Sequence, residues 1–315
     1  MNPYFVSRKV CPCCSSPESG EIYRNPFTES PVRDYLEAFY NAQGRIEFDY
    51  LEGAQYTLIE CRRCGLVFQQ EVPGNELAAI LYERWIDPGI AMRQYEDRTG
   101  LAFYAEHAEN VMRLIAYFGV KPSSLSFLDF GMGWGKWALM VKAFGCASYG
   151  LDLSSARTTR AQSAGVTILG RKDLDGRQFD FVSADWVFEH IPDPFETLVE
   201  LREVLKANGV LRISVPIVRD IGRRLKVMDW NAAKDARDSL NAVAPLEHIN
   251  CFRRETLLEM ASAAGMREVF IPVDRRYQLA KRLSTLRRLA KNIVLPILPG
   301  LARDYVFLGK PRRTP

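Results

Sequence analysis

The chain has no long apolar run, and this absence narrows what the protein can be. Among its 315 residues, no stretch approaches the roughly 20 apolar residues that a membrane-spanning helix needs. The longest candidate, residues 293–302, is interrupted by Pro296 and Pro299. The N-terminus also lacks the apolar core of a secretory signal. We therefore expect a cytoplasmic protein without a membrane span.

Internal repeats and low-complexity segments are also absent. The hydrophobic content of 47% and the charged content of 25% are close to globular averages, so we expect a well-buried core. The length leaves room for about two domains. Seven cysteines in a chain without a secretory signal favour metal ligands or free thiols over disulfides.

The net charge of +4 arises from the C-terminal part of the chain. Residues 275–315 hold 11 of the 42 Lys and Arg residues and a single acidic residue, so the remainder is net acidic. From Leu279 to Ile293, apolar residues recur at helical spacing with basic side chains beside them. Residues 275–295 are therefore expected to form a basic amphipathic helix. It either contacts an anionic membrane or partner, or packs on its own sheet with a solvated basic face.

The cysteines near the N-terminus form two CxxC pairs, Cys11 with Cys14 and Cys61 with Cys64. Each pair can present two thiolates to one tetrahedral ion, at Zn–S distances of about 2.3 Å. Four protein ligands leave no position for a reactive water, so we expect a structural zinc site. A redox dithiol would explain one pair but not both. Cys13 is expected to be a bystander.

The chain divides into two regions by pattern. Residues 1–92 combine the cysteine pairs with short strands and a helix near residues 32–43, and are expected to be a zinc-binding region. Residues 93–315 begin with a helix predicted over 93–125, after which strands and helices alternate. Helices are predicted at 134–145, 154–164, 194–207 and 254–264, and strands at 126–130, 147–153, 166–169, 179–188, 210–215, 268–273 and 304–309. This alternation predicts an α/β fold with a parallel, Rossmann-like sheet and a ligand crevice at the carboxyl ends of its strands.

A glycine-spaced loop follows the first of these strands. An acid, Asp129, precedes Gly131, Gly133 and Gly135, and a second apolar run ends in Asp152. Glycines allow the backbone to approach a ligand closely, and a carboxylate at the tip of the next strand can bind both ribose hydroxyls. The pattern predicts a site for an adenosine-containing cofactor. A glycine turn without a ligand, with Asp152 as a helix cap, is the alternative.

The spacing favours S-adenosylmethionine over NAD. In the dinucleotide fingerprint G-x-G-x-x-G the third glycine would fall at position 136, which is Lys136 here. Asp129 would repel a pyrophosphate, whereas it would attract the cationic amino and sulfonium groups of S-adenosylmethionine.

With these features the sequence resembles class I S-adenosylmethionine-dependent methyltransferases, whose signature is an acid-x-Gly-x-Gly-x-Gly loop. The resemblance covers roughly residues 95–315 and includes the segment from Phe179 to Pro216. It implies that Asp152 is the ribose-binding acid, and it nominates Asp173 beside the adenine. The cysteine pairs make the chain similar to bacterial methyltransferases with an N-terminal zinc-binding region, among them sugar methyltransferases.

Only three histidines are available as a catalytic base. His107 lies in a predicted helix and is expected to be a surface or packing residue. His190 follows the fourth strand and is expected to be a crevice wall or, alternatively, the base. The pair Glu247-His248 resembles a Glu-His pair of the zinc-containing sugar methyltransferases, which implies that His248 is the base and that Glu247 orients it or binds a sugar hydroxyl. The alternative is a histidine satisfied by loop backbone.

We therefore expect an S-adenosylmethionine-dependent methyltransferase that acts on a small molecule, most plausibly a sugar or glycan hydroxyl. A nucleic-acid methyltransferase is an alternative, because a zinc region and a basic segment permit it. Against it, the strand ending in ADWVFEH lacks the Asn/Asp-Pro-Pro-aromatic motif of base-amino methyltransferases, so nucleic acid is not the expected partner. A non-catalytic scaffold that retains the cofactor fold is the second alternative.

Overall fold

The computed structural model describes residues 2–234 and 236–271. The expected basic helix at 275–295 and the expected strand at 304–309 lie outside the described residues. The chain divides into one compact unit made of Met1–Val111 and Lys121–Val269, and a second made of Met112–Val120 and Phe270–Pro315. The sheets, the pocket and the side-chain clusters described below belong to the first unit. Across the described ranges, none of the helices has the length and apolar character needed to cross a membrane.

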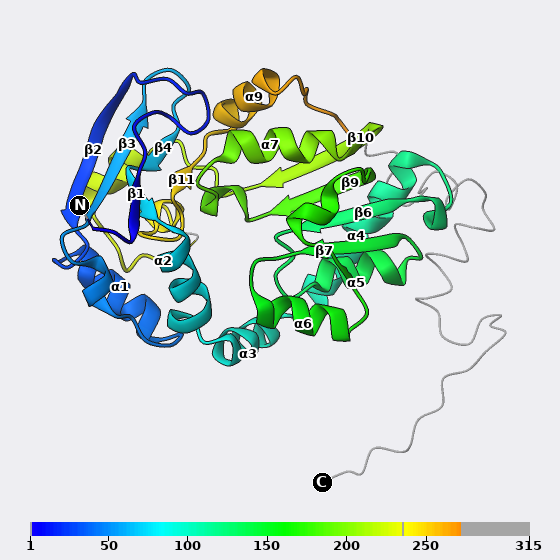
Figure 1. Ribbon diagram of the computed structural model, residues 1–315, viewed down its shortest axis with the longest axis horizontal. Coiled ribbons are helices and arrows are strands. Elements are labelled where there is room, and N and C mark those ends of the chain that lie inside the picture. The colour runs from blue at the N-terminus through cyan, green and yellow to red at the C-terminus, as the bar shows by residue number, and fades with distance from the viewer. Residues whose placement is uncertain (1, 235, 272–315) are drawn as a thin grey trace, which may run out of the picture. The chain divides into compact units, whose positions relative to one another are not determined.

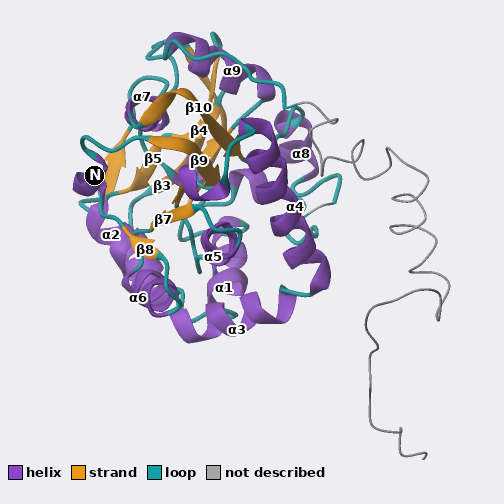
Figure 2. Ribbon diagram, turned by 90° about the vertical axis from the view of Figure 1, so that its right-hand side faces the viewer, coloured by secondary structure: helices purple, strands orange, loops and turns teal. Residues whose placement is uncertain are grey.

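A five-stranded parallel sheet confirms the expected α/β, Rossmann-like fold class. Its strand order is β10-β9-β6-β7-β8, with every neighbouring pair parallel. The strands are β6 (Ser126–Phe130), β7 (Ala147–Leu151), β8 (Thr167–Ile168), β9 (Phe179–Asp185) and β10 (Leu205–Ser214). Helices α5 (Lys136–Ala143) and α6 (Ser155–Ser163) cover one face, while α7 (Pro194–Glu203) and α9 (Arg254–Ala263) cover the other (Figures 1 and 2). Because both faces are covered, the central strands are largely buried, as in β6, where only Ser126 is not fully buried.

Several elements differ from the sequence expectation in their bounds. The helix expected over 93–125 is two helices, α3 (Pro88–Arg98) and α4 (Leu101–Phe118), separated at Thr99 and Gly100. The helix expected over 194–207 ends at Glu203, because the chain enters β10 at Leu205 and bulges before Val210. Of the strand expected over 268–273, the described residues 268–271 form no strand.

A second, antiparallel sheet contains the N-terminal strands and one strand from far along the chain. Its order is β11-β4-β3-β2, where β2 is Ser19–Pro26, β3 is Gln55–Cys61, β4 is Val67–Gln69 and β11 is Asn250–Cys251. A further pair joins β1 (Phe5–Ser7) to β5 (Glu71–Pro73). Helix α1 (Val32–Asn41) lies between β2 and β3 in the chain, and α2 (Asn75–Ile80) follows β5.

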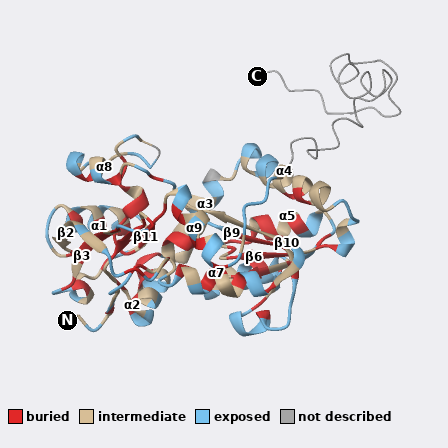
Figure 3. Ribbon diagram, turned by 90° about the horizontal axis from the view of Figure 1, so that it is seen from above, coloured by how far each residue is buried: buried red, intermediate tan, exposed pale blue. Residues whose placement is uncertain are grey.

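The apolar core beneath this sheet also combines distant segments. Tyr40, Tyr56 and Trp85 are fully buried in it, and Trp230 packs against Tyr56 with ring centroids 5.9 Å apart. Helix α8 (Ile221–Val227) adds two further buried side chains. Buried residues run along both sheets (Figure 3). Residues from the range 218–251 complete the N-terminal sheet and its core, although they lie far along the chain. The domain boundary expected at residue 92/93 stays a prediction.

Arg8 ties three segments together. Its guanidinium donates to the carbonyl oxygens of Gln69 (2.6 Å), Ile249 (2.7 Å) and Pro192 (3.2 Å), and to Oδ1 of Asn250 (2.7 Å). Asn250 in turn donates from Nδ2 to the carbonyl oxygens of Phe188 (3.1 Å) and Ile191 (2.7 Å). Burial lowers the pKa of Arg8 to about 10, so the guanidinium remains charged at neutral pH. The N-terminal region, the segment entering β11 and the turn after β9 therefore share one set of hydrogen bonds.

We expect Arg8→Met to lower the free energy of unfolding by about 2–4 kcal/mol, because it leaves several buried acceptors without a donor. The exposed neighbour Lys9 provides the control. Lys9→Met is expected to change stability by no more than about 0.5 kcal/mol. Equilibrium unfolding in denaturant, with zinc present throughout, measures both values. Equal effects of the two substitutions would contradict the role of Arg8.

Candidate functional site

The glycine loop lies between β6 and α5. Gly131, Gly133 and Gly135 all have positive φ angles, of 72°, 54° and 71°. A Cβ on Gly131 would lie 2.5 Å from Cγ2 of Val187, and one on Gly135 would lie 2.8 Å from Cβ of Ala161. A Cβ on Gly133 would meet no atom within 4 Å. The first and third glycines therefore permit close packing of the loop, while the middle one faces open space.

A pocket of about 330 Å³ opens beside this loop. It is lined from β6 and the loop by Asp129, Gly131 and Gly133, and from α3 and α4 by Tyr95, Phe103 and His107. Asp185 and Trp186 close it at the end of β9, where Trp186 has a positive φ of 57° and is 53% exposed. His107, which the sequence analysis placed at the surface or in packing, thus forms part of the pocket wall.

A buried carboxylate and a guanidinium face the same pocket. Asp129 is 5% exposed, and burial raises its pKa to about 7. Arg212, on β10, donates to Oγ of Ser183 at 3.0 Å and lies 3.6 Å from the Asp185 carboxylate. Its Nε is buried and has no hydrogen-bond partner among the described residues. Sequence reasoning missed Arg212, since an arginine in an otherwise apolar strand gives no motif.

These charges fit S-adenosylmethionine. Its methionine part carries an ammonium, which a carboxylate attracts, and a carboxylate, which a guanidinium binds well. Asp129 and the unpartnered Arg212 Nε provide both groups in one pocket.

Asp152 braces the loop from the end of β7. Its Oδ2 accepts a hydrogen bond from the Gly133 amide (2.8 Å), and its Oδ1 accepts one from the Ser154 amide (2.9 Å). Since each carboxylate oxygen can accept about two hydrogen bonds, capacity for ribose hydroxyls remains. Asp173 is exposed and accepts a hydrogen bond from the Gly170 amide (2.8 Å) within its own turn. The cofactor contacts expected of Asp152 and Asp173 stay predictions.

The structure brings Glu247, His248 and His190 together. The rings of His190 and His248 meet edge to face with centroids 4.9 Å apart. His248 donates from Nδ1 to the Asn241 carbonyl, and Glu247 accepts a hydrogen bond from Oη of Tyr40 (2.9 Å). Burial lowers the pKa of His190 to about 3 and that of His248 to about 4, so both rings are neutral at pH 7.

The loop that carries Glu247 and His248 is fastened to the N-terminal sheet. Gln69 of β4 donates to the carbonyl oxygens of Ala244 (3.0 Å) and His248 (3.1 Å), and accepts from the Leu246 amide (3.3 Å). The N-terminal region therefore fixes the position of residues expected to meet the acceptor. Their catalytic roles stay predictions.

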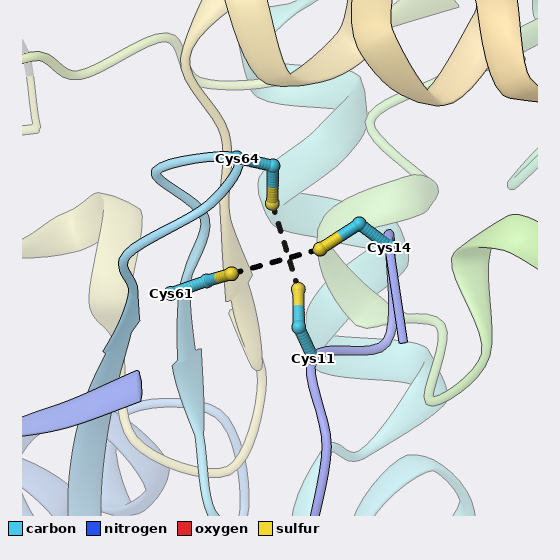
Figure 4. Close-up of side chains that lie close together, drawn as sticks. All are labelled: Cys11, Cys14, Cys61 and Cys64. Atoms are coloured by element: carbon cyan, nitrogen blue, oxygen red, sulfur yellow. Dashed lines mark hydrogen bonds between the residues drawn. The ribbon is translucent and has the colours of Figure 1, made fainter. Parts of the chain in front are cut away.

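The two cysteine pairs converge on one point. The Sγ atoms of Cys11 and Cys64 lie 3.5 Å apart and those of Cys14 and Cys61 lie 3.6 Å apart. Dashed lines join these two pairs in Figure 4. All four sulfurs lie within 4.8 Å of one another. A tetrahedron with Zn–S bonds of about 2.3 Å has edges of about 3.8 Å, so the cluster fits a zinc ion. Cys13 is buried outside this group.

Comparison with known proteins identifies a family. Residues 103–269, more than half of the chain, match a family model described as a methyltransferase domain. No curated protein matches the chain.

Similar solved structures include an S-adenosylmethionine-dependent methyltransferase from Thermotoga maritima (22% identity, 56% of this chain and 78% of that one, TM-score 0.36). Others are the plantazolicin methyltransferase (16%, 59% and 72%, TM-score 0.43) and an amino pentose methyltransferase from Micromonospora echinaspora (22%, 39% and 54%, TM-score 0.34). The chain spans about half the length of the last of these. These likenesses are partial, and the family assignment depends on the match to the family model alone.

Proposed function

Because the chain belongs to the methyltransferase-domain family of S-adenosylmethionine-dependent class I enzymes, we propose that its acceptor is a small molecule, specifically a sugar or glycan hydroxyl. The observation that supports this proposal is a charged cofactor pocket at the end of β6 together with His190 and His248, whose rings meet beside the turn after β9 with Glu247 adjacent in sequence. When bound, S-adenosylmethionine would supply an electrophilic methyl carbon, open to attack by an oxygen nucleophile in line with the sulfur leaving group.

The proposed cofactor-binding side chains have distinct tasks, with Asp129 and Arg212 in the pocket lining and Asp152 and Asp173 outside it. Asp129 binds the ammonium of the methionine part and Arg212 binds its carboxylate. Asp152 holds Gly133 in place and accepts from the ribose hydroxyls, while Asp173 lies on the adenine side. Gly131 and Gly135 allow the loop to pack against Val187 and Ala161. Correct positioning of the two reactants supplies much of the rate in such a displacement.

The acceptor meets Glu247, His248 and His190. Glu247, held by Tyr40, is an acceptor for sugar hydroxyls. Because His248 uses Nδ1 to donate to Asn241, its Nε2 keeps a lone pair with which it activates the hydroxyl that receives the methyl group. A sugar is favoured by the resemblance of the combined cysteine region and methyltransferase sheet to bacterial sugar methyltransferases.

Cys11, Cys14, Cys61 and Cys64 are proposed to hold a structural zinc ion. Each ligand pair sits in a tight turn, as the hydrogen bonds from Ser15 N to Cys11 O (2.9 Å) and from Gly65 N to Cys61 O (3.0 Å) indicate. Thr256 of α9 donates to the Cys64 carbonyl at 2.7 Å. The ion would therefore stabilise the end of β3 and the start of α9.

The affinity for S-adenosylmethionine is expected to rise about ten-fold between about pH 5.5 and about pH 7, because Asp129 ionises in this interval while the ligand amine stays protonated. Calorimetric titration measures this. In Asp129→Asn, binding should be weaker and independent of pH. Adenosine, which lacks the methionine part and its ammonium group, is the ligand control. Its binding should not depend on pH in this interval. An unchanged pH dependence in the variant would contradict the assignment of Asp129.

His248→Asn is expected to lower kcat by about 100-fold or more, because it removes the group that activates the hydroxyl. The assay follows methyl transfer from S-adenosylmethionine to a panel of nucleotide-sugars and free sugars. Binding of S-adenosylhomocysteine should be unchanged in the variant, since His248 lies outside the cofactor pocket. Methyl transfer to RNA but to no sugar would show that the proposed sugar acceptor is wrong and that the acceptor is a nucleic acid.

Cys14→Ser is expected to lower the free energy of unfolding by about 3 kcal/mol, because the metal loses a ligand whose binding is coupled to folding. It should also weaken the thiolate-to-cobalt charge-transfer absorption of the cobalt-substituted protein. Cys13→Ser is the matched control, since Cys13 is adjacent but outside the cluster. If both variants keep the full absorption band, the four-cysteine site is wrong.

A further inference from the structure

Glu189 is a buried carboxylate that the fold does not use. Its side chain is 0% exposed, and neither carboxylate oxygen has a hydrogen-bond partner among the residues described. A buried carboxyl group without partners is costly, and native proteins retain such groups chiefly when they are paired or bind metal. The two unpartnered carboxyl oxygens of Glu189 are therefore free to bind a ligand from outside the chain.

Two imidazoles complete a set of donors beside it. One ligand atom each from Glu189, His190 and His248 lies within 4.8 Å of the other two. His248 donates from Nδ1 to the Asn241 carbonyl, which leaves the lone pair of Nε2 available for a metal ion. This is the arrangement common around metal-bound histidines, where the second ring nitrogen donates to a carbonyl and fixes the ring.

No cation of the protein neutralises this carboxylate within the described ranges. Arg157 and Lys234 are close enough to influence the pKa of His190, but neither forms an ion pair with Glu189. Arg157 lies instead 3.9 Å from the carboxylate of Asp152. Burial raises the pKa of Glu189 to about 8, so the carboxyl group is mostly protonated at neutral pH unless a cation binds. The cluster thus combines one buried carboxyl group and two neutral imidazoles, with no cation of the protein paired to the carboxyl group among the described residues.

We propose that Glu189, His190 and His248 bind one divalent first-row transition metal ion. Two imidazoles and one carboxylate suit such an ion, and three protein ligands leave coordination positions open. The site differs from the cysteine cluster, whose four thiolates prefer softer ions and close the coordination shell.

The inference deepens the proposed function and rests on it for the role of the ion. His248 activates the acceptor hydroxyl as a metal ligand and not as the proton acceptor. The hydroxyl occupies an open position, the ion lowers its pKa, and its proton passes to solvent water. The oxygen then forms a bond to the methyl carbon as the carbon–sulfur bond breaks, and S-adenosylhomocysteine leaves with the electron pair on sulfur.

The test is titration of the full chain, with its cysteine cluster loaded with zinc, by MnCl₂. The loss of the free Mn²⁺ signal in electron paramagnetic resonance reports binding. We expect one Mn²⁺ per chain, with affinity weakened about ten-fold or more by Glu189→Gln and by His248→Asn. Glu196→Gln is the matched control, because Glu196 is an exposed glutamate on α7. It should bind Mn²⁺ like the unaltered chain.

Thermal unfolding separates loss of the site from misfolding. Without Mn²⁺, Glu189→Gln should melt at a higher temperature than the unaltered chain, since it removes a buried carboxylate. With Mn²⁺, only the unaltered chain and Glu196→Gln should gain in melting temperature. Absence of binding, or equal binding by Glu189→Gln, overturns the inference.

S-adenosylmethionine binding and methyl transfer are measured on the same samples. If the chain binds S-adenosylmethionine and methylates a sugar without Mn²⁺ uptake, the metal site fails and the proposed function stands. If S-adenosylmethionine does not bind, the proposed function itself fails, whatever the Mn²⁺ titration gives.

Discussion

The guanidinium of Arg8 holds together the backbone segments that carry His190 and His248, two residues proposed to meet the methyl acceptor. Its acceptors lie in β4, in the turn after β9 and at the start of β11, so these three segments must meet where one planar group can reach all of them. The turn after β9 carries His190, and the segment entering β11 carries His248. The two rings are in contact because the backbones that bear them are held by Arg8 and Asn250. A cation near the N-terminus thereby positions residues about 180 and 240 positions later, and such charge-assisted hydrogen bonds are the stronger ones.

The cofactor side is organised differently, by short-range packing. The glycine loop contacts Val187 at one end and Ala161 at the other, and Asp152 pins its middle. None of these contacts involves the N-terminal sheet. The cofactor pocket is therefore built around the parallel sheet and helices α3 and α4, whereas the residues proposed to meet the acceptor are held by segments of both sheets.

What could be predicted from the sequence follows this division. The loop from Asp129 to Gly135 is local, so the order of residue types indicated both the strand–loop–helix unit and its fold class, and the structure confirms the fold class. The strand pair β11 and β4 joins residues about 180 positions apart, and no local pattern predicts it. The same holds for Arg8 and Arg212, whose partners are defined only in three dimensions. The break at Thr99 and Gly100 was missed because the apolar face that predicted the helix begins only at Leu101, so the preceding residues gave no boundary.

Arg8 and Glu189 differ in whether the fold provides partners for their polar atoms. Arg8 is half-buried and Glu189 is fully buried, and each would be costly without partners. Arg8 has four acceptors, so the fold accounts for its position. Glu189 has none within the described residues, although one ring nitrogen each of His190 and His248 lies within 4.8 Å of one of its carboxyl oxygens. A sequence selected only for stability would place an apolar residue or a glutamine at position 189, because either removes the buried carboxylate. A bound cation would therefore explain why an acid stands at position 189 beside two neutral imidazoles. The hydrogen bonds of Arg8 hold the segments that carry these three side chains.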